Sequence, residues 1–167
     1  RTVDELAGAI RRLAIRGAPA LGIAGAMGVA LAAIRSGESD PVRFRRDLHR
    51  AAEILRSTRP TAVNLGWGID RVLGAADAAG SVEAAKEAAV REASAVAGED
   101  EVTCRRIGAF GAELLPERCT VLTHCNAGAL ACRCWGTALG VVRSAVEAGK
   151  DVRVIACETR PLNQGSR

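Results

Sequence analysis

The stretch Thr120-Val121-Leu122-Thr123-His124-Cys125-Asn126-Ala127-Gly128-Ala129-Leu130 is a β-branched run that passes into a Gly- and Ala-rich turn. Residues 120–123 are predicted to form a buried parallel strand, because β-branched and aliphatic side chains stand between polar boundaries in a run too short for a helix. The chain turns at 126–128, and residues 129–146 are predicted to form the returning helix. Cys125 is therefore expected at a strand end, facing a helix N-terminus that favours an anion. Its thiol should ionise more easily than a free thiol, the alternative being a small apolar side chain under a tight turn.

A second strand is predicted at residues 152–157, so the chain from Cys119 onward follows a strand, turn, helix, strand pattern typical of a βαβ unit. The preceding chain is predicted to be helical, and the domain boundary is placed near Pro116. The fold class is therefore α/β, with an all-helical domain at residues 1–116 and the start of a parallel-sheet domain at residues 117–167. Ligands bind at the carboxyl edge of such sheets, so Gln164, after the second strand, and Cys125 are expected to face one crevice.

Two arginines stand at predicted breaks between helices. Thr2-Val3-Asp4-Glu5 is a capping box that starts a helix over residues 3–13. Arg16-Gly17-Ala18-Pro19 then breaks it, with Gly17 free to take a positive φ and Pro19 suited to the first position of the next helix. Thr58-Arg59-Pro60-Thr61 forces a second break, and Thr61 is predicted to cap a helix over residues 62–79. Each break is either an anion-binding corner with an arginine beside it or an ordinary turn.

The remaining helices carry packing signals. Residues 17–34 lack charge but are rich in Gly and Ala, which favours a buried helix over a membrane span. Asp40-Pro41 is predicted to cap a helix whose buried face holds Phe44, Leu48, Ala52 and Leu55. Residues 81–115 are predicted to be helical with a break near Gly98. Their core positions are predicted to be Val90, Ala97, Cys104, Ile107 and Leu114.

The composition excludes several classes of protein. Apolar residues make up 49% of the chain but aromatic residues only 2%, so the interior must be built from aliphatic residues. The net charge of +4 arises from basic residues scattered among acidic ones, without the basic and aromatic clusters of a nucleic-acid interface. The six cysteines are predicted to be reduced thiols. His124, Cys125, Cys132 and Cys134 are possible zinc ligands, but the Cys-x-Cys spacing argues against a metal site.

Five motifs in order carry a family resemblance. The motifs are Ile15-Arg16-Gly17-Ala18-Pro19-Ala20, Thr58-Arg59-Pro60-Thr61-Ala62-Val63-Asn64-Leu65, Thr123-His124-Cys125-Asn126-Ala127-Gly128, Gly136-Thr137-Ala138-Leu139-Gly140-Val141 and Glu158-Thr159-Arg160-Pro161-Leu162-Asn163-Gln164-Gly165. With these motifs the chain resembles the methylthioribose-1-phosphate isomerase family, within the wider family that includes the regulatory subunits of initiation factor 2B.

The resemblance implies an aldose–ketose isomerase of methionine salvage that converts 5-methylthioribose 1-phosphate to 5-methylthioribulose 1-phosphate. Substrate binding would fall to Arg16, Gly17, Ala18, Arg59 and Gln164, and Cys125 would be catalytic. The βαβ unit would begin an incomplete Rossmann-like domain. The enzyme would be a cytoplasmic homodimer that needs no cofactor and binds neither nucleic acid nor a membrane.

The same resemblance implies that the chain is a fragment lacking both ends. In the family a catalytic aspartate and an Asn-Lys pair follow the region matched here, so this piece alone is expected to be inactive. The chain also departs from the family pattern: Cys157 stands where Asp is usual, and Cys132-Arg133-Cys134-Trp135 replaces a segment with fewer cysteines that ends in Tyr.

Two other functions remain open on the sequence. A ribose 1,5-bisphosphate isomerase would share the arginine and cysteine motifs, although Asn64-Leu65-x-Trp67 favours the thiosugar enzyme. A non-catalytic regulatory subunit of the initiation factor 2B type is the other, and retention of Cys125 with both arginine corners argues against it.

Overall fold

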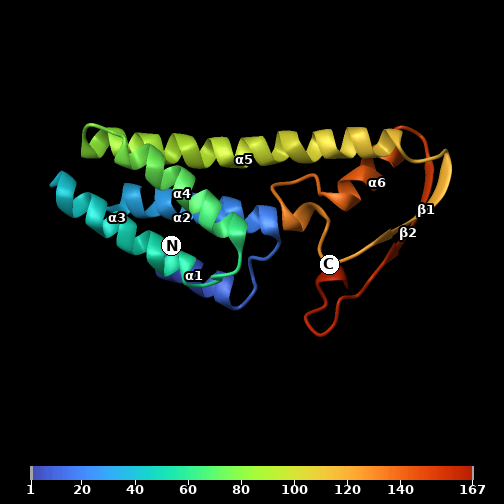
Figure 1. The fold of residues 1–167 in the computed structure, drawn as a ribbon, viewed down its shortest axis with the longest axis horizontal. Helices are drawn as coiled ribbons and strands as arrows, with labels where there is room; N and C mark the ends of the chain where they lie inside the picture. The colour runs from blue at the N-terminus through green and yellow to red at the C-terminus, as the bar shows by residue number, and fades with distance from the viewer. Residues whose placement is uncertain (1, 167) are drawn as a thin grey trace. The chain divides into compact units, whose positions relative to one another are not determined.

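The computed structural model describes residues 2–166, which form two compact units. The first comprises Arg1–Gly98 and the second Glu99–Arg167. A single helix, α5, runs from one into the other (Figure 1). Unit 1 holds α1 (Val3–Arg11), α2 (Ala18–Arg35), α3 (Pro41–Arg56), α4 (Val63–Asp77) and the first part of α5 (Val82–Glu113). Unit 2 holds the rest of α5, β1 (Arg118–Thr123), the 3₁₀ turn η1 (Ala129–Ala131), α6 (Ala138–Glu147), β2 (Asp151–Ala156) and the 3₁₀ turn η2 (Gln164–Ser166).

Capping residues set the starts of α1 and α3. The backbone N–H of Glu5 donates to Thr2 Oγ1 at 3.2 Å and the Glu5 carboxylate accepts from the Thr2 N–H at 2.8 Å, which confirms the predicted capping box. Asp40 accepts from the N–H of Arg43 at 2.8 Å. The helix that follows buries the predicted stripe of Phe44, Leu48, Ala52 and Leu55. These ends are local in sequence, so the sequence alone predicts them.

The centre of unit 1 is the contact between α2 and α4. A Cβ atom added at Gly68 would lie 2.0 Å from the carbonyl oxygen of Gly22, and one added at Gly25 would lie 2.7 Å from that of Leu65. The two backbones therefore touch where side chains would normally separate them. Nine residues of α2 are buried. By length and composition α2 is also the one helix among residues 2–166 that could cross a membrane, and its packing follows the buried-helix prediction.

The core of unit 1 is aliphatic and small. Leu, Ile, Val and Ala side chains from all five helices fill it, with Phe44 as its buried aromatic side chain. The contribution of α5 comes from Val82, Ala85, Ala89, Ala93 and Val96. An interior of this kind depends on short distances between helices, because small side chains fill little space.

The helix α5 is continuous, so the break predicted near Gly98 is wrong. A Cβ added at Gly98 would meet nothing within 4 Å, so the glycine serves no turn there. The predicted core positions divide: Ala97 and Cys104 are buried, whereas Val90, Ile107 and Leu114 are exposed. The contacts between residues separate the chain into its two units within α5, after Gly98. The boundary predicted near Pro116 marks a different feature, the change from helix to strand, and it stays a prediction.

Unit 2 is built on the predicted βαβ unit. β1 and β2 pair in parallel, with Arg118 opposite Asp151 and Thr123 opposite Ala156, and α6 packs against both strands. This confirms the α/β fold class. The expected burial of β1 is wrong, because only Thr123 of that strand is buried and Leu122 is 69% exposed. Within residues 2–166 one helix covers the sheet, and one helix can bury only one face.

The contact between α2 and α4 gives a stability test. Gly68→Ala should lower the free energy of unfolding by roughly 1–3 kcal/mol, because the new methyl group overlaps the carbonyl of Gly22. Gly74→Ala in the same helix is the matched control, since an added Cβ there meets nothing within 4 Å. It should raise stability by about 0.5–1 kcal/mol through helix propensity. Urea unfolding followed by circular dichroism measures both, and an equal gain in the two variants would contradict the contact.

Candidate functional site

Cys125 lies just past the carboxyl end of β1 and is exposed. Its φ of +65° is in the left-handed region, which residues other than glycine seldom occupy. Such backbone strain persists where surrounding contacts hold it, and it gathers at functional sites. The holding contacts here come from the following turn, where the carbonyl of Ala127 accepts from the N–H groups of Thr137 at 3.0 Å and Leu139 at 3.2 Å.

The helix predicted to start at Ala129 begins only at Ala138, which is a correction. Residues 129–131 form a 3₁₀ turn, and the chain between the turn and α6 is irregular. Cys125 therefore does not face the N-terminus of a long helix. The N–H groups at the start of α6 point to the Ala127 carbonyl instead. What marks Cys125 is its exposed thiol and its left-handed backbone.

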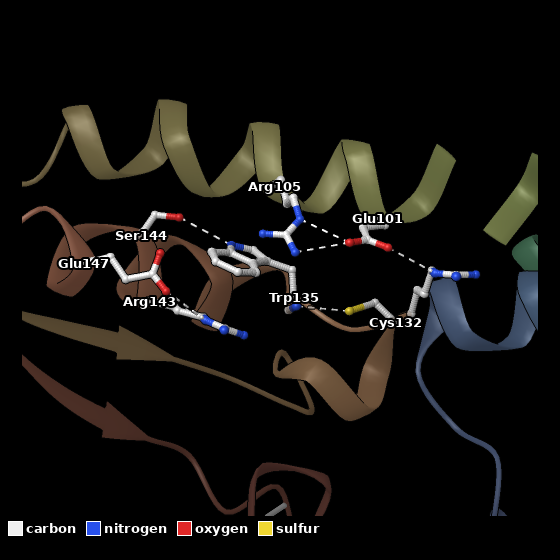
Figure 2. A network of polar contacts seen from close by, with 9 residues as sticks. Glu101, Arg105, Cys132, Trp135, Arg143, Ser144 and Glu147 are labelled. Carbon is white, nitrogen blue, oxygen red and sulfur yellow. Dashed lines mark hydrogen bonds and ion pairs between the residues drawn. The ribbon is translucent and has the colours of Figure 1, made fainter. Parts of the chain in front are cut away.

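The side chain of Trp135 explains the irregular segment. Its ring lies between two guanidinium groups, with Cζ of Arg105 at 4.2 Å and Cζ of Arg143 at 3.9 Å from the ring centre (Figure 2). Its indole N–H donates to Ser144 Oγ at 3.3 Å. Gly108 makes room for the ring, since a Cβ there would lie 2.8 Å from the indole nitrogen. These contacts hold Trp135 on α5 and α6 and keep its segment out of the helix.

Asn126 is a candidate site residue that the sequence analysis did not single out. Its Oδ1 is buried and accepts no hydrogen bond from residues 2–166. A buried acceptor without a donor is rare in proteins and marks a place for a ligand or water. The sequence signal that could have identified Asn126 is its position directly after Cys125, in the turn that follows β1.

Gln164 lies in the loop that leaves the same edge of the sheet as Cys125. The N–H of Cys157 donates to the carbonyl of Thr123 at 3.0 Å and joins the two strand ends. The loop then folds back on itself: Gly165 N–H donates to Thr159 Oγ1 at 2.7 Å, and a Cβ at Gly165 would overlap the carbonyl of Cys157. Gln164 is half-buried at the start of η2. Both residues therefore lie at the carboxyl edge of the sheet, and that they face one crevice stays a prediction.

The two carboxylates nearest in sequence to this edge are already engaged. Asp151 lies at the start of β2, at the opposite edge, and pairs with Arg118 at 3.0 Å. Glu158 pairs with Arg160 at 2.7 Å. Neither is placed to serve as an acid/base beside Cys125.

In unit 1 the two arginine corners lie at one end. Gly22, one turn into α2, meets Asn64, Trp67 and Gly68 in the first turns of α4, so the N-termini of these helices are neighbours. Arg16–Ala18 and Arg59–Ala62 precede those N-termini. Gly17 has a φ of +106°, as predicted, and Pro19 stands at the second position of α2, one later than expected.

Both neighbouring helix ends lack a side-chain cap. Neither α2 nor α4 has a capping side chain or an acidic residue in its first turn, whereas α1 and α3 are capped by Thr2 and Asp40. Capping of α4 by Thr61 was expected and is wrong, because Ala62 takes the N-cap position. Uncapped N–H groups and a positive dipole end attract anions. The structure thus brings two anion-favouring helix starts together.

Arg59 lines an open groove of about 630 Å³ with Arg56, Trp67 and Arg71. Arg56 pairs with Asp70 at 2.5 Å, and that hydrogen bond raises the pKa of the Arg56 guanidinium. Arg71 pairs with Glu92 and lies over the Trp67 ring. The half-buried side chain of Arg59 makes no hydrogen bond or ion pair with residues 2–166. Its charge is therefore available for an anionic ligand.

Comparison with known proteins shows the family of the chain. The sequence model of the initiation factor 2 subunit family matches residues 14–167. A 5-deoxyribose 1-phosphate isomerase of Moorella thermoacetica is 50% identical over all of this chain and 48% of its own length. The chain spans about half the length of the curated relatives it matches.

Two crystal structures are similar in fold as well as sequence. One, 5-methylthioribose 1-phosphate isomerase from Pyrococcus horikoshii, is 41% identical with a TM-score of 0.91, over 99% of this chain and 47% of that one. The other is titled as the translation initiation factor eIF-2B, subunit delta, from A. fulgidus. It is 60% identical with a TM-score of 0.88, over 100% of this chain and 49% of that one. The chain therefore belongs to the initiation factor 2 subunit family.

Proposed function

We propose that the protein is an aldose–ketose isomerase that converts 5-methylthioribose 1-phosphate to 5-methylthioribulose 1-phosphate. The observation that carries the proposal is the pair of uncapped helix starts at one end of unit 1, each preceded by an arginine. A phosphate monoester suits this arrangement, because N–H groups and guanidinium donors both bind phosphate oxygens. Similarity to the P. horikoshii isomerase supports the choice of reaction.

The chemistry divides between holding the sugar and moving hydrogen. A phosphate on the anomeric oxygen locks the sugar as a ring, so the enzyme must promote ring opening while it keeps the phosphate in place. Arg16, Gly17, Ala18, Arg59 and Gln164 are proposed to bind the phosphate and the hydroxyl groups. Such positioning and charge stabilisation account for a large part of enzymatic rate enhancement.

Cys125 is proposed to act on the reacting carbons. Its exposed thiol at the sheet edge would stabilise the transition state or relay a proton between C1 and C2. The orphan acceptor of Asn126 beside it would take a hydrogen bond from a sugar hydroxyl. Transfer of hydrogen between neighbouring carbons also needs an acid/base, which contributes roughly 10²- to 10⁴-fold. The homodimer, the cytoplasmic location and the absence of a cofactor remain predictions.

The main alternative substrates differ in the group that the sugar carries on C5. The name of the M. thermoacetica relative gives a deoxy sugar, and a ribose 1,5-bisphosphate would carry a second phosphate there. Trp67 lines the groove beside Arg59 and is 47% exposed. The motif Asn64-Leu65-x-Trp67 supports the thiosugar enzyme through the family resemblance. A role as a translation initiation factor subunit, as in the name of the A. fulgidus structure, would not need the strained Cys125.

The first test of the reaction is turnover of the proposed substrate. We predict that the 167-residue chain binds 5-methylthioribose 1-phosphate without converting it, because Asp151 and Glu158 are both held in ion pairs. The same chain joined to the part of the A. fulgidus relative that it does not cover should form the ketose. NMR of the sugar carbons follows both reactions. Equal rates would show that the acid/base lies within this chain, and no ketose from either would refute the isomerase.

A second test concerns the proposed binding of the substrate phosphate by Arg59. In the joined protein, Arg59→Ala should weaken substrate binding by roughly 1.5–3 kcal/mol, the range for hydrogen bonds to charged groups. Arg46→Ala is the control, because Arg46 is exposed on α3 and pairs with its neighbour Asp47. Isothermal titration calorimetry gives the dissociation constants. If the two variants bind with the affinity of the parent protein, Arg59 does not hold the phosphate.

A further inference from the structure

Three potential metal ligands from distant parts of the sequence meet in unit 2. They are Oδ1 or Oδ2 of Asp100, Sγ of Cys104 and Sγ of Cys132, and one atom from each lies within 4.8 Å of the others. Asp100 and Cys104 are one turn apart on α5, and Cys132 follows η1. Cys104 is 2% exposed and Cys132 8% exposed, while Asp100 is half-buried. None of the three belongs to the site described above.

We propose that Asp100, Cys104 and Cys132 bind a divalent metal ion of the zinc class. Two thiolates and a carboxylate are ligands that Zn²⁺ accepts, and soft sulfur ligands exclude Mg²⁺ and Ca²⁺. Zn–S bonds of about 2.3 Å and Zn–O bonds of about 2.0–2.2 Å place tetrahedral ligands roughly 3.5–4 Å apart. Small side-chain rotations would therefore close the group around an ion. Three protein ligands leave a fourth position for water.

Contacts around the ligands orient them for this purpose. Asp100 Oδ2 accepts from the backbone N–H of Arg133 at 2.8 Å, while its Oδ1 lies 4.0 Å from Cys104 Sγ. The N–H of Gly136 donates to Cys132 Sγ at 3.1 Å (Figure 2). Outer hydrogen bonds of this kind fix the direction of metal ligands in known sites.

The basic side chains near the three ligands pair with a different carboxylate, so they do not occupy the proposed position of the metal ion. Glu101, the next carboxylate on α5, is held by Arg105 at 3.1 Å and Arg133 at 3.2 Å, and the Arg105 hydrogen bond lowers the pKa of Glu101. Burial, followed by the Asp100 carboxylate, raises the pKa of the Cys104 thiol to about 12. A bound metal ion reverses that preference, because a coordinated thiol loses its proton.

The site links two parts of unit 2. Cys132 directly follows η1, which itself follows the turn that carries Cys125. A metal ion would tie this segment to α5 beside the Trp135 contacts. The site differs from the possible zinc ligands His124, Cys125, Cys132 and Cys134 of the sequence analysis, because the two groups share only Cys132. Spacing along the chain could not reveal it, because Asp100 and Cys132 meet only in the fold.

Cobalt binding tests the proposal on the 167-residue chain, kept reduced and freed of metal with a chelator. Co²⁺ should bind with one ion per chain and give the near-ultraviolet absorption of sulfur-to-cobalt charge transfer, and Zn²⁺ should displace it. Cys104→Ser and Cys132→Ser should lose this band. Cys119→Ser, a half-buried cysteine on β1 outside the cluster, should keep it.

A second variant covers the case in which a cysteine variant fails to fold. Asn in place of Asp100 still accepts from the Arg133 N–H, so Asp100→Asn should keep the band and bind Zn²⁺ at least about tenfold more weakly, the scale seen when metal surroundings are altered. Absence of the band in the parent chain would overturn the proposal. So would a band that survives both cysteine changes, or one lost in Cys125→Ser or Cys134→Ser instead.

Discussion

The close approach of α2 and α4 is the constraint on which unit 1 depends. Gly22 and Gly68 allow the two backbones to touch: a side chain at Gly68 would push the helices apart, and a Cβ at Gly22 would lie 3.2 Å from the Asn64 carbonyl oxygen. Because the contact joins the first turns of both helices, it also places the two arginine corners at one end of the unit. An interior with few aromatic side chains needs this closeness, since Ala and Gly fill little space. Packing and the proposed phosphate binding thus rest on the same glycines.

Unit 2 reaches its arrangement by a different route. Its parallel strand pair fixes where the Cys125 and Gln164 loops leave the sheet, and the stacking of Trp135 between Arg105 and Arg143 fixes where α6 begins. The irregular segment before α6 is therefore held by tertiary contacts on both sides. It follows the strained turn at Cys125 and brings Cys132 to α5.

The features that the sequence predicted well are local or periodic. The Thr2 and Asp40 caps, the positive φ of Gly17, the buried stripe of α3 and the βαβ order all depend on neighbours within a few residues. The errors arose where distant residues decide. Trp135 and the Asp100–Arg133 hydrogen bond delay the start of α6, and packed neighbours carry α5 through Gly98 despite a propensity cost of about 1 kcal/mol. The orphan acceptor of Asn126 and the Asp100–Cys104–Cys132 group likewise exist only in the folded chain.

The central claim is that chemistry takes place at Cys125, at the carboxyl edge of the sheet. The most direct measurement is the rate of ketose formation by Cys125→Ala in the protein that turns over substrate, beside Cys119→Ala on the same strand. We expect kcat to fall by roughly 10²- to 10⁴-fold in Cys125→Ala, the usual contribution of a group that moves a proton in the transition state. Cys119→Ala should change kcat little. A Cys125→Ala enzyme with the parent rate would contradict it.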